Sequence, residues 1–243
     1  MKKSLNNSPG PSFQQRGFTL IELMIAGLLG LILTAGMIQI FIGSSQTFSV
    51  QRAISEVLDK GRTATNFISS EIENAGFGGD GLVASAFATL PNNVVFAAGT
   101  SDGTGAVNDV IRVQSTGIRD CTGTVIGAPF LVVNTFDVVA GELRCNGQPL
   151  INGVESFHVL YGVDSDGDSF VDQYMTSTRV VATGNTTNVA AVRFEMLVAS
   201  QQTRVFSENI SRDYKILDEA PINKTDRRLR RKFSATVILV NTP

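Results

Sequence analysis

An uninterrupted apolar run from Phe18 to Ile42 constrains this chain more than any other feature of its sequence. The run reads "FTLIELMIAGLLGLILTAGMIQIFI" and contains a single charged side chain, Glu22. A helix of about 25 residues is about 37 Å long, whereas the hydrocarbon core of a bilayer is about 30 Å thick. The run therefore predicts a membrane-spanning helix over residues 18–42. The basic residues before it favour a cytoplasmic N-terminus and export of everything that follows.

Two features separate this run from an ordinary secretory signal. Its apolar core is longer than such a signal needs, and no small-residue cleavage site follows it. The polar residues 1–17 contain three basic side chains and no acid, and they show no apolar period. An acid inside a membrane helix costs up to about 3 kcal/mol at the bilayer centre and usually has a partner. Glu22 therefore indicates a specialised helix rather than a plain anchor.

The string "RGFTLIELMIAG" around Glu22 resembles the class III signal of type IV pilins and pseudopilins. The resemblance implies that a prepilin peptidase cuts between Gly17 and Phe18 and methylates the new N-terminal Phe18. Residues 1–17 would then be a cleaved leader peptide. Glu22 would neutralise the α-amine of a neighbouring subunit in the low dielectric of the filament core, which strengthens such a pair.

The helical period continues beyond the apolar run. Through residues 43–76, apolar or small residues recur at i, i+3 and i+4, and no proline occurs between Pro11 and Pro91. The pattern predicts one helix from about residue 18 to residue 75, whose amphipathic second part, 43–76, packs one stripe onto a head. The glycines of "GFGGDG" at 76–81 follow a helix instead of a strand, so they predict a helix stop and a loop. The predicted stripe comprises Val50, Ile54, Val57, Leu58, Gly61, Ala64, Ile68, Ile72 and Ala75.

Residues 77–243 are predicted to form a β-rich head. Short apolar runs alternate with Gly, Asn and Asp, and no long helical period separates them, which favours an antiparallel sheet. The polar, turn-rich stretches 99–109 and 182–189 are predicted to be loops. The fold class is therefore α+β: a long N-terminal helix, membrane-spanning in its first half, packed on an antiparallel β-rich globular head. The predicted strands are Val94–Ala98, Val110–Gln114, Phe130–Val139, Glu155–Val163, Val171–Met175, Ala190–Ala199 and Phe233–Val240.

The head extends the resemblance. The stretches "LINGVESFHVLYGVDSDGDSFVDQYM", "VAAVRFEMLVAS" and "RLRRKFSATVILVN" are similar to PilW-type minor pilins of the type IV pilus. This implies a pilin-like fold and a subunit that initiates or assembles the pilus at or near its tip. Such a subunit supports adhesion, twitching motility or DNA uptake. The alternatives are a J-type minor pseudopilin of a type II secretion system, and a tip module that acts as an adhesin or binds DNA.

The resemblance also implies partners and a location. The partners are other minor pilins, the major pilin, the prepilin peptidase, the inner membrane and a tip adhesin. The protein would reside in the bacterial inner membrane with a periplasmic head, and on the pilus or cell surface after assembly. Direct binding of nucleic acid is not expected, because a sequence pI of about 5.5 differs from that of a nucleic-acid-coating protein. No enzymatic activity and no required cofactor are expected.

The two cysteines of the chain, Cys121 and Cys145, lie 24 residues apart. An exported head meets an oxidising compartment, where two cysteines tend to pair. The sequence therefore predicts a disulfide, which for a loop of this size stabilises the fold by about 3–4 kcal/mol on the chain-entropy estimate.

The segment "DSDGDSFVDQYM" carries closely spaced aspartates. They match positions 1, 3, 5 and 9 of a calcium loop, and a carbonyl would serve at position 7. Ser169 stands where an EF-hand has Gly and Met175 where it has a bidentate Glu, which excludes a full EF-hand. A calcium-binding turn and a solvated Asp/Gly hairpin turn both remain open. The calcium ligands would be Asp164, Asp166, Asp168, Phe170 and Asp172.

A basic run precedes the last predicted strand: Lys224, Arg227, Arg228, Arg230, Arg231 and Lys232. A solvated face or salt bridges to the acidic head are favoured over contact with DNA or an acidic partner. The single histidine, His158, lies in an apolar strand and is interpreted as structural. A catalytic triad would depend on this one residue, which argues against a hydrolase.

Overall fold

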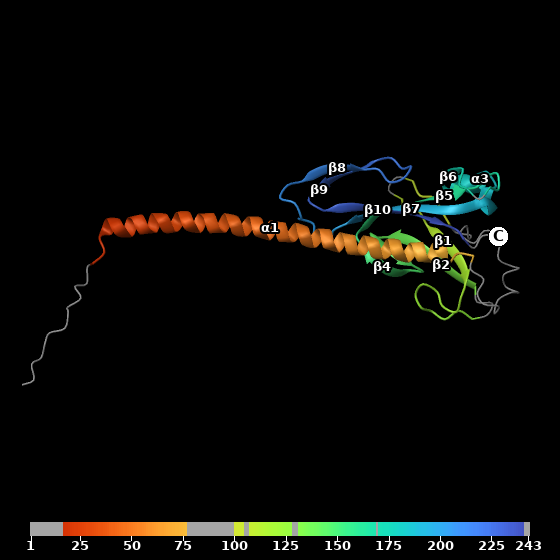
Figure 1. Ribbon diagram of the computed structural model, residues 1–243, viewed down its shortest axis with the longest axis horizontal. Helices are drawn as coiled ribbons and strands as arrows, with labels where there is room; N and C mark the ends of the chain where they lie inside the picture. The colour runs from red at the N-terminus through yellow and green to blue at the C-terminus, as the bar shows by residue number, and fades with distance from the viewer. Residues whose placement is uncertain (1–16, 77–99, 105–106, 128–130, 169, 241–243) are drawn as a thin grey trace, which may run out of the picture. The chain divides into compact units, whose positions relative to one another are not determined.

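The computed structural model describes residues 17–76, 100–104, 107–127, 131–168 and 170–240. The chain divides into two compact units, residues 1–47 and residues 48–243, and each is described by itself. In chain order the elements are α1 (Leu20–Glu73), β1 (Ile111–Thr116), β2 (Leu131–Val139), β3 (Glu142–Cys145), β4 (Gln148–Asn152), β5 (Val154–Val163), β6 (Gln173–Met175), α3 (Ser177–Ala182), the 3-10 helix η1 (Asn185–Asn188), β7 (Val189–Ala199), β8 (Ile210–Tyr214), β9 (Ile222–Asp226) and β10 (Arg230–Ile238) (Figure 1).

The first unit contains the apolar part of α1. Every described residue from 17 to 47 is exposed within the structure. An 18-residue window of the helix has a mean hydropathy of 2.3, so α1 is long and apolar enough to cross a membrane. The helix begins at Leu20 and not at the expected residue 18, since Phe18 and Thr19 precede its first turn.

The second unit contains the rest of α1, which buries one stripe of small and aliphatic side chains. Its contacts reach two sheets. The ring of Phe67 meets Phe136 of β2 edge-on at a centroid distance of 6.1 Å. A Cβ atom added to Gly61 would overlap the ring of Phe233 of β10, so this glycine allows a close approach. The buried stripe comprises Ala53, Val57, Gly61, Ala64, Ile68 and Ile72.

The helix ends two residues earlier than expected. After Glu73, residues 74–76 form a turn in which Ala75 and Gly76 are buried. The N–H of Gly76 donates to the carbonyl of Gln114 in β1, at 3.0 Å. The chain is thereby tied to the head as soon as the helix stops. The remaining glycines of the predicted loop lie outside the described residues.

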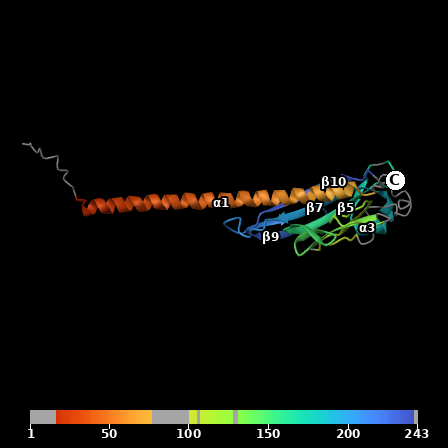
Figure 2. The ribbon, with the colours of Figure 1, turned by 90° about the horizontal axis from the view of Figure 1, so that it is seen from below.

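The described strands of the head form two four-stranded antiparallel sheets and one hairpin. The first sheet has the order β1-β2-β3-β4, and the second has the order β10-β7-β5-β6. The hairpin pairs β8 with β9. Figure 2 shows β10, β7 and β5 beside the second part of α1. The α+β fold class with an antiparallel head is confirmed.

Most of the predicted apolar runs lie in strands, whereas several polar elements were not predicted. Strand β8 reads "ISRDY" and exposes its centre, so it has no apolar period to detect. Strands β3 and β4 meet at Asn146 and Gly147, which have φ of 49° and 80° and form a tight turn. Residues 185–188, expected to be loop, form η1. The predicted strand Val94–Ala98 lies outside the described residues.

The two sheets are joined at Gly153, which separates β4 from β5. Its φ of 84° is in the left-handed region that favours glycine. The N–H of Gly153 donates to the carbonyl of Gly141 at 2.8 Å, and its carbonyl accepts from the N–H of Ala199 at 2.7 Å. One residue thus turns the chain from the first sheet into the second and bonds to both.

The contact between Gly61 and Phe233 generates a test of how α1 packs. Gly61→Leu should lower the free energy of unfolding by about 1–3 kcal/mol, because the added side chain overpacks this contact. Leucine otherwise favours a helix over glycine by about 0.8 kcal/mol. The measurement is denaturant unfolding of the full chain in detergent.

Asn66→Leu, on the exposed face of the same helix, is the matched control and should not destabilise the protein. Adding Phe233→Ala to Gly61→Leu should restore part of the loss, since the two residues share the contact. Wild-type stability of Gly61→Leu would contradict this description of the interface.

Candidate functional site

The start of α1 places Glu22 in a capping box with Thr19. The backbone N–H of Glu22 donates to the hydroxyl of Thr19 at 3.3 Å. The carboxylate of Glu22 accepts from the hydroxyl and the backbone N–H of Thr19, at 3.4 and 3.5 Å. These reciprocal bonds satisfy N–H groups that have no partner within the helix.

Thr19 is a residue that the sequence reasoning missed, although "TLIE" has the Thr-x-x-Glu spacing of a capping box. Its consequence is positional: the carboxylate of Glu22 is held at the first turn, close in sequence to the bond between Gly17 and Phe18. Gly17 and Phe18 themselves lie outside the helix, and Phe18 is 84% exposed. Both residues at the predicted cleavage point are therefore non-helical and exposed.

Cys121 and Cys145 form a disulfide in the head, with their Cα atoms 6.4 Å apart. Cys145 is the last residue of β3 and is fully buried, whereas Cys121 lies in the loop between β1 and β2. The N–H of Cys121 also donates to the side-chain oxygen of Asn134 in β2, at 3.0 Å. The bond thus attaches an irregular loop to the first sheet.

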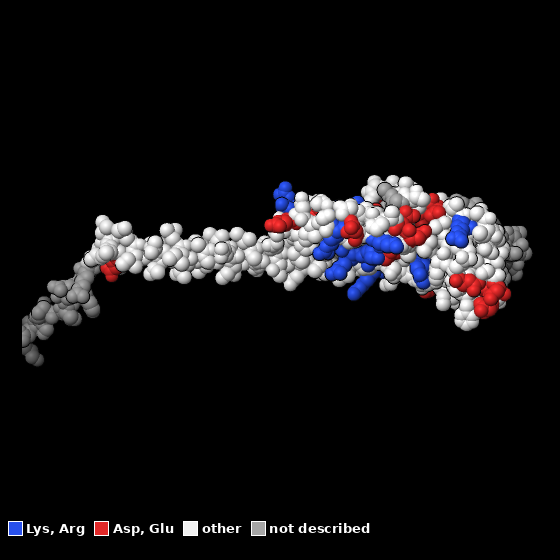
Figure 3. Space-filling view, turned by 90° about the horizontal axis from the view of Figure 1, so that it is seen from above, with Lys and Arg blue, Asp and Glu red and all other residues white. Residues whose placement is uncertain are grey.

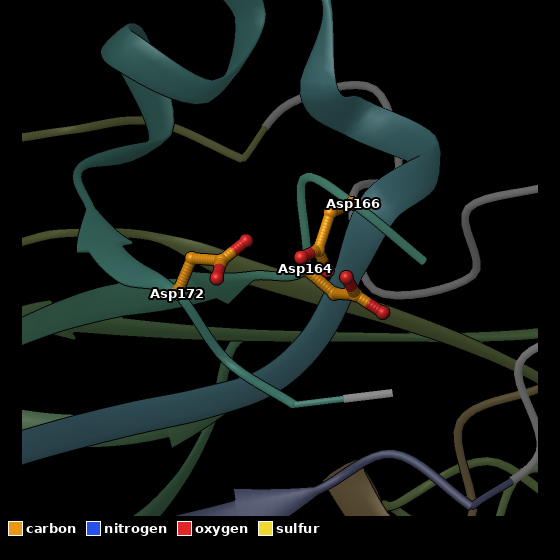
Figure 4. Close-up of side chains that lie close together, drawn as sticks. All are labelled: Asp164, Asp166 and Asp172. Carbon is orange, nitrogen blue, oxygen red and sulfur yellow. The ribbon is translucent and has the colours of Figure 1, made fainter. Parts of the chain in front are cut away.

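The predicted calcium ligands lie in and beside the loop that joins β5 to β6. The structure brings three of them together: one carboxylate oxygen from each of Asp164, Asp166 and Asp172 lies within 4.8 Å of the others (Figure 4). Asp168 and Phe170 are not part of this group. The carboxylate of Asp168 accepts from the N–H of Phe170 at 2.8 Å, and the Phe170 side chain is 73% exposed.

Hydrogen bonds within the loop also support its shape without a metal ion. Gly167, with φ of 81°, donates its N–H to Asp164 at 2.7 Å, and Ser165 donates its N–H to Asp172 at 2.8 Å. A hydrogen bond from the N–H of Asp168 lowers the pKa of Asp166, but the charges of Asp168, Asp172 and Asp164 outweigh it and raise that pKa. The group therefore combines an Asp/Gly turn with carboxylates that repel one another.

The basic run is mostly neutralised by acids of the head. Arg230, only 6% exposed, contacts Glu155 at 2.7 Å and Asp226 at 2.6 Å. Arg228 contacts the same Glu155 at 3.3 Å and donates two hydrogen bonds to the carbonyl of Ser200, at 2.9 and 2.6 Å. Two further pairs are Lys224 with Glu155, at 3.7 Å, and Lys232 with Glu195, at 2.9 Å.

These ion pairs tie the β8–β9 hairpin to the second sheet, because Asp226 ends β9 while Glu155 belongs to β5 and Arg230 to β10. Figure 3 shows basic and acidic side chains interleaved on this face. Within the described residues, only Arg227 and Arg231 of the run lack an ion pair. The run therefore serves mainly as an internal clamp.

His158 is buried in β5 and bonded to Asp109. Its Nδ1 lies 3.1 Å from Oδ1 of Asp109, which also accepts from the N–H of Gly103. The other oxygen, Oδ2, accepts from the N–H of Val159. Burial would lower the pKa of His158, but Asp109, Glu219 and Asp218 together raise it. At 2% exposure the imidazole is inaccessible to a substrate, which agrees with a structural role.

Asp226 provides a test of the clamp by pH. The hydrogen bond from Arg230 holds the pKa of Asp226 at about 2, below its ordinary value of 3.8. The stability gained from this ionised carboxylate is complete above pH 3.8 and is lost as the pH falls towards 2. Asp226→Asn should therefore lower stability at neutral pH and flatten the fall in stability between pH 4 and about 2.

The measurement is thermal unfolding of the full chain across that pH range. Asp59→Asn, at an exposed carboxylate on α1, measures the effect of removing any surface acid. An equally steep acid transition in Asp226→Asn would show that the clamp does not depend on Asp226.

Two known protein families match separate parts of the chain, one at the start of the helix and one in the head. The family described as "Prokaryotic N-terminal methylation motif" matches residues 12–38, which include Gly17, Phe18 and Glu22. The family described as "Type IV Pilus-assembly protein W" matches residues 113–241, more than half of the chain. None of the curated proteins compared with the chain matches it.

Among solved structures, the chain is similar to a type IV-like pilin from Thermus thermophilus, at 16% sequence identity and a TM-score of 0.47. The similarity covers 76% of this chain and 96% of that one. The two family matches, at residues 12–38 and 113–241, agree with the helix and the head described above. The chain therefore belongs to the PilW family of type IV pilus-assembly proteins and is a pilus-related minor pilin.

Proposed function

We propose that a prepilin peptidase cuts this protein between Gly17 and Phe18 and methylates Phe18, and that the mature subunit helps to initiate and assemble the type IV pilus. One observation carries the proposal: a single chain contains both the N-terminal methylation motif, at residues 12–38, and the pilus-assembly region, at residues 113–241. The exposed, non-helical Gly17 and Phe18 support cleavage at this point.

Before assembly, the subunit is stored in the inner membrane with its N-terminus in the cytoplasm and its head in the periplasm. The basic leader and the apolar part of α1 support this topology. The disulfide between Cys121 and Cys145 agrees with a head that matures in an oxidising compartment. After assembly, the apolar helix enters the filament core and the head contacts other minor pilins and the major pilin.

Glu22 is the assembly residue in this proposal. Cleavage creates a cationic α-amine on Phe18, next to the Thr19 that holds the carboxylate in the first turn. Within a membrane or a filament core the attraction between amine and carboxylate is stronger than in water. The carboxylate of one subunit therefore neutralises the amine of its neighbour and sets the register between their helices.

The head supplies protein–protein surfaces and no catalytic site. Its histidine is buried, and most of its basic run is neutralised internally. We place the subunit at or near the pilus tip, where it supports adhesion, twitching motility or DNA uptake through the filament and without binding nucleic acid itself. A tip adhesin is a further partner.

Substitution of Glu22 separates its charge from its capping role. Glu22→Gln keeps an oxygen that can accept from Thr19 but removes the charge. It should be processed normally yet be lost from sheared pili, as should Glu22→Ala. Thr19→Val, which removes the hydroxyl only, should still assemble. N-terminal peptide mass spectrometry and immunoblots of membranes and sheared pili are the measurements.

Each outcome discriminates between functions. Wild-type assembly of Glu22→Gln would show that Glu22 acts only as a cap. A membrane-extracted wild-type chain that retains residues 1–17 would contradict the cleavage. A processed wild-type chain that is absent from external pili would instead favour the short filament of a type II secretion system.

We also propose that Asp164, Asp166 and Asp172 bind Ca²⁺, with Asp168 and the carbonyl of Phe170 as further ligands. Repulsion among the three grouped carboxylates supports this, since a hard cation that prefers oxygen ligands would relieve it. Affinity in the range of extracellular modules is expected, with a Kd of about 0.1–1 mM.

Calorimetry and thermal unfolding of the full chain with Ca²⁺ test this second proposal. Millimolar Ca²⁺ should raise the unfolding temperature of the wild type but not of Asp164→Asn or Asp172→Asn. Asp218→Asn, at an exposed acid outside the loop, should respond as the wild type does. An unchanged unfolding temperature in the wild type would leave the loop as an Asp/Gly turn.

A further inference from the structure

The two sides of the β10-β7-β5-β6 sheet differ in how their backbone is protected. Where β5 extends beyond the three-residue β6, its backbone is hydrogen-bonded to Asn108 and Asp109, two residues that precede β1. Phe157 donates its N–H to the side chain of Asn108 at 2.7 Å, and Val159 donates to Asp109 at 2.7 Å. The carbonyl of Phe157 accepts from the N–H of Asp109 at 3.0 Å. These bonds occupy the outward backbone groups at Phe157 and Val159, so no further strand can pair with this part of β5.

The other side of the sheet is the nine-residue β10, which pairs with β7 in one unbroken register. Leu239 donates its N–H to the carbonyl of Ala190, directly opposite in that register. Because bonding alternates along an antiparallel strand, the odd-numbered residues of β10 bond to β7. The N–H and C=O groups of Ser234 and Thr236 then point away from β7, and within the described residues nothing bonds to them.

Strand β10 is long and has no proline or bulge, and beyond Lys232 it has no charge. That part of the strand therefore lacks the devices by which proteins protect exposed edges. From Phe233 to its end at Ile238 the strand reads "FSATVI", with no charge and no proline. Ser234 and Thr236 are exposed. Charge is confined to the beginning of the strand, where Lys232 is paired with Glu195 and the exposed Arg231 has no acid partner within the described residues.

We propose that the free edge of β10 is a docking site for an extended strand of a neighbouring pilin subunit. The strand bonds to the backbone of Ser234 and Thr236 and places a carboxylate opposite Arg231. Main-chain hydrogen bonds supply the affinity in such strand addition, and side chains supply the specificity. The inference rests on the proposed function, because it identifies the surface through which the subunit joins others.

Ser234→Pro tests the edge without disturbing the sheet. Proline is tolerated on an edge strand where its N–H would have faced solvent, so β10 should still pair with β7. The variant loses one outward donor and blocks the approach of a strand. We expect its recovery in sheared pili, relative to the membrane pool, to fall by about tenfold or more. Ser234→Ala, which keeps the backbone N–H, is the matched control and should assemble as the wild type does.

Two further measurements make the result decisive. Disulfide formation and the unfolding temperature of Ser234→Pro should match those of the wild type. Hydrogen exchange of the wild-type full chain should show rapid exchange for the amides of Ser234 and Thr236 in detergent and protection in the isolated filament. This comparison needs no variant, so it remains valid even if Ser234→Pro folds poorly.

The outcomes are distinguishable. Normal assembly of a folded Ser234→Pro, or equal exchange in both states, overturns strand addition and leaves the proposed function standing. Absence of the wild-type chain from the filament overturns the proposed function, and the inference with it.

Discussion

Burial of one narrow stripe of α1 is the contact on which the head depends. The two four-stranded sheets share this helix as their common support: Phe67 meets Phe136 of one sheet, and Gly61 lies against Phe233 of the other. Small residues on the stripe let the helix approach closely, and Ile68 and Ile72 fill the space farther along. The helix is therefore part of the core of the head and not an appendage to it.

Carboxylates are stabilised by different means in different parts of the chain. Glu155 accepts three cationic side chains where β9, β10 and β5 come together. Asp109 accepts hydrogen bonds from a histidine and two backbone N–H groups in the interior. Glu22 has only its own first turn and Thr19. Of these three acids, Glu22 is the one whose hydrogen bonds within the described residues are all local.

The sequence was most informative where one periodicity extends over many residues. The apolar run, the stripe on α1 and the long strands β5, β7 and β10 follow from it, because each buries a face that needs apolar side chains at regular intervals. Strands β8 and β9 could not be predicted in this way, since polar side chains and ion pairs hold them. The clamp around Glu155 joins residues about 75 positions apart, as in the pair with Arg230, and no local pattern encodes such a meeting.

In the candidate site, the motif at Gly17, Phe18 and Glu22 could be recognised from the sequence because its residues are close together in the chain. The disulfide could be predicted because the chain has only two cysteines. The sequence also predicted that aspartates cluster in one loop, but it did not predict the geometry of that loop. Asp168 lies outside the group that Asp164 forms with Asp166 and Asp172. The direction in which each aspartate side chain points depends on the path of the backbone, which turns at Gly167 with φ of 81°. The spacing of the aspartates in the sequence does not reveal that path.

The hydrogen bonds from β5 to Asn108 and Asp109 have a consequence for solubility. A sheet with two open sides can add copies without limit, which is the route to cross-β aggregates. Asn108 and Asp109 bond to the backbone of β5, so the part of β5 that lies beyond β6 cannot pair with a further strand. The part of β5 that β6 leaves uncovered is thereby prevented from seeding such an aggregate.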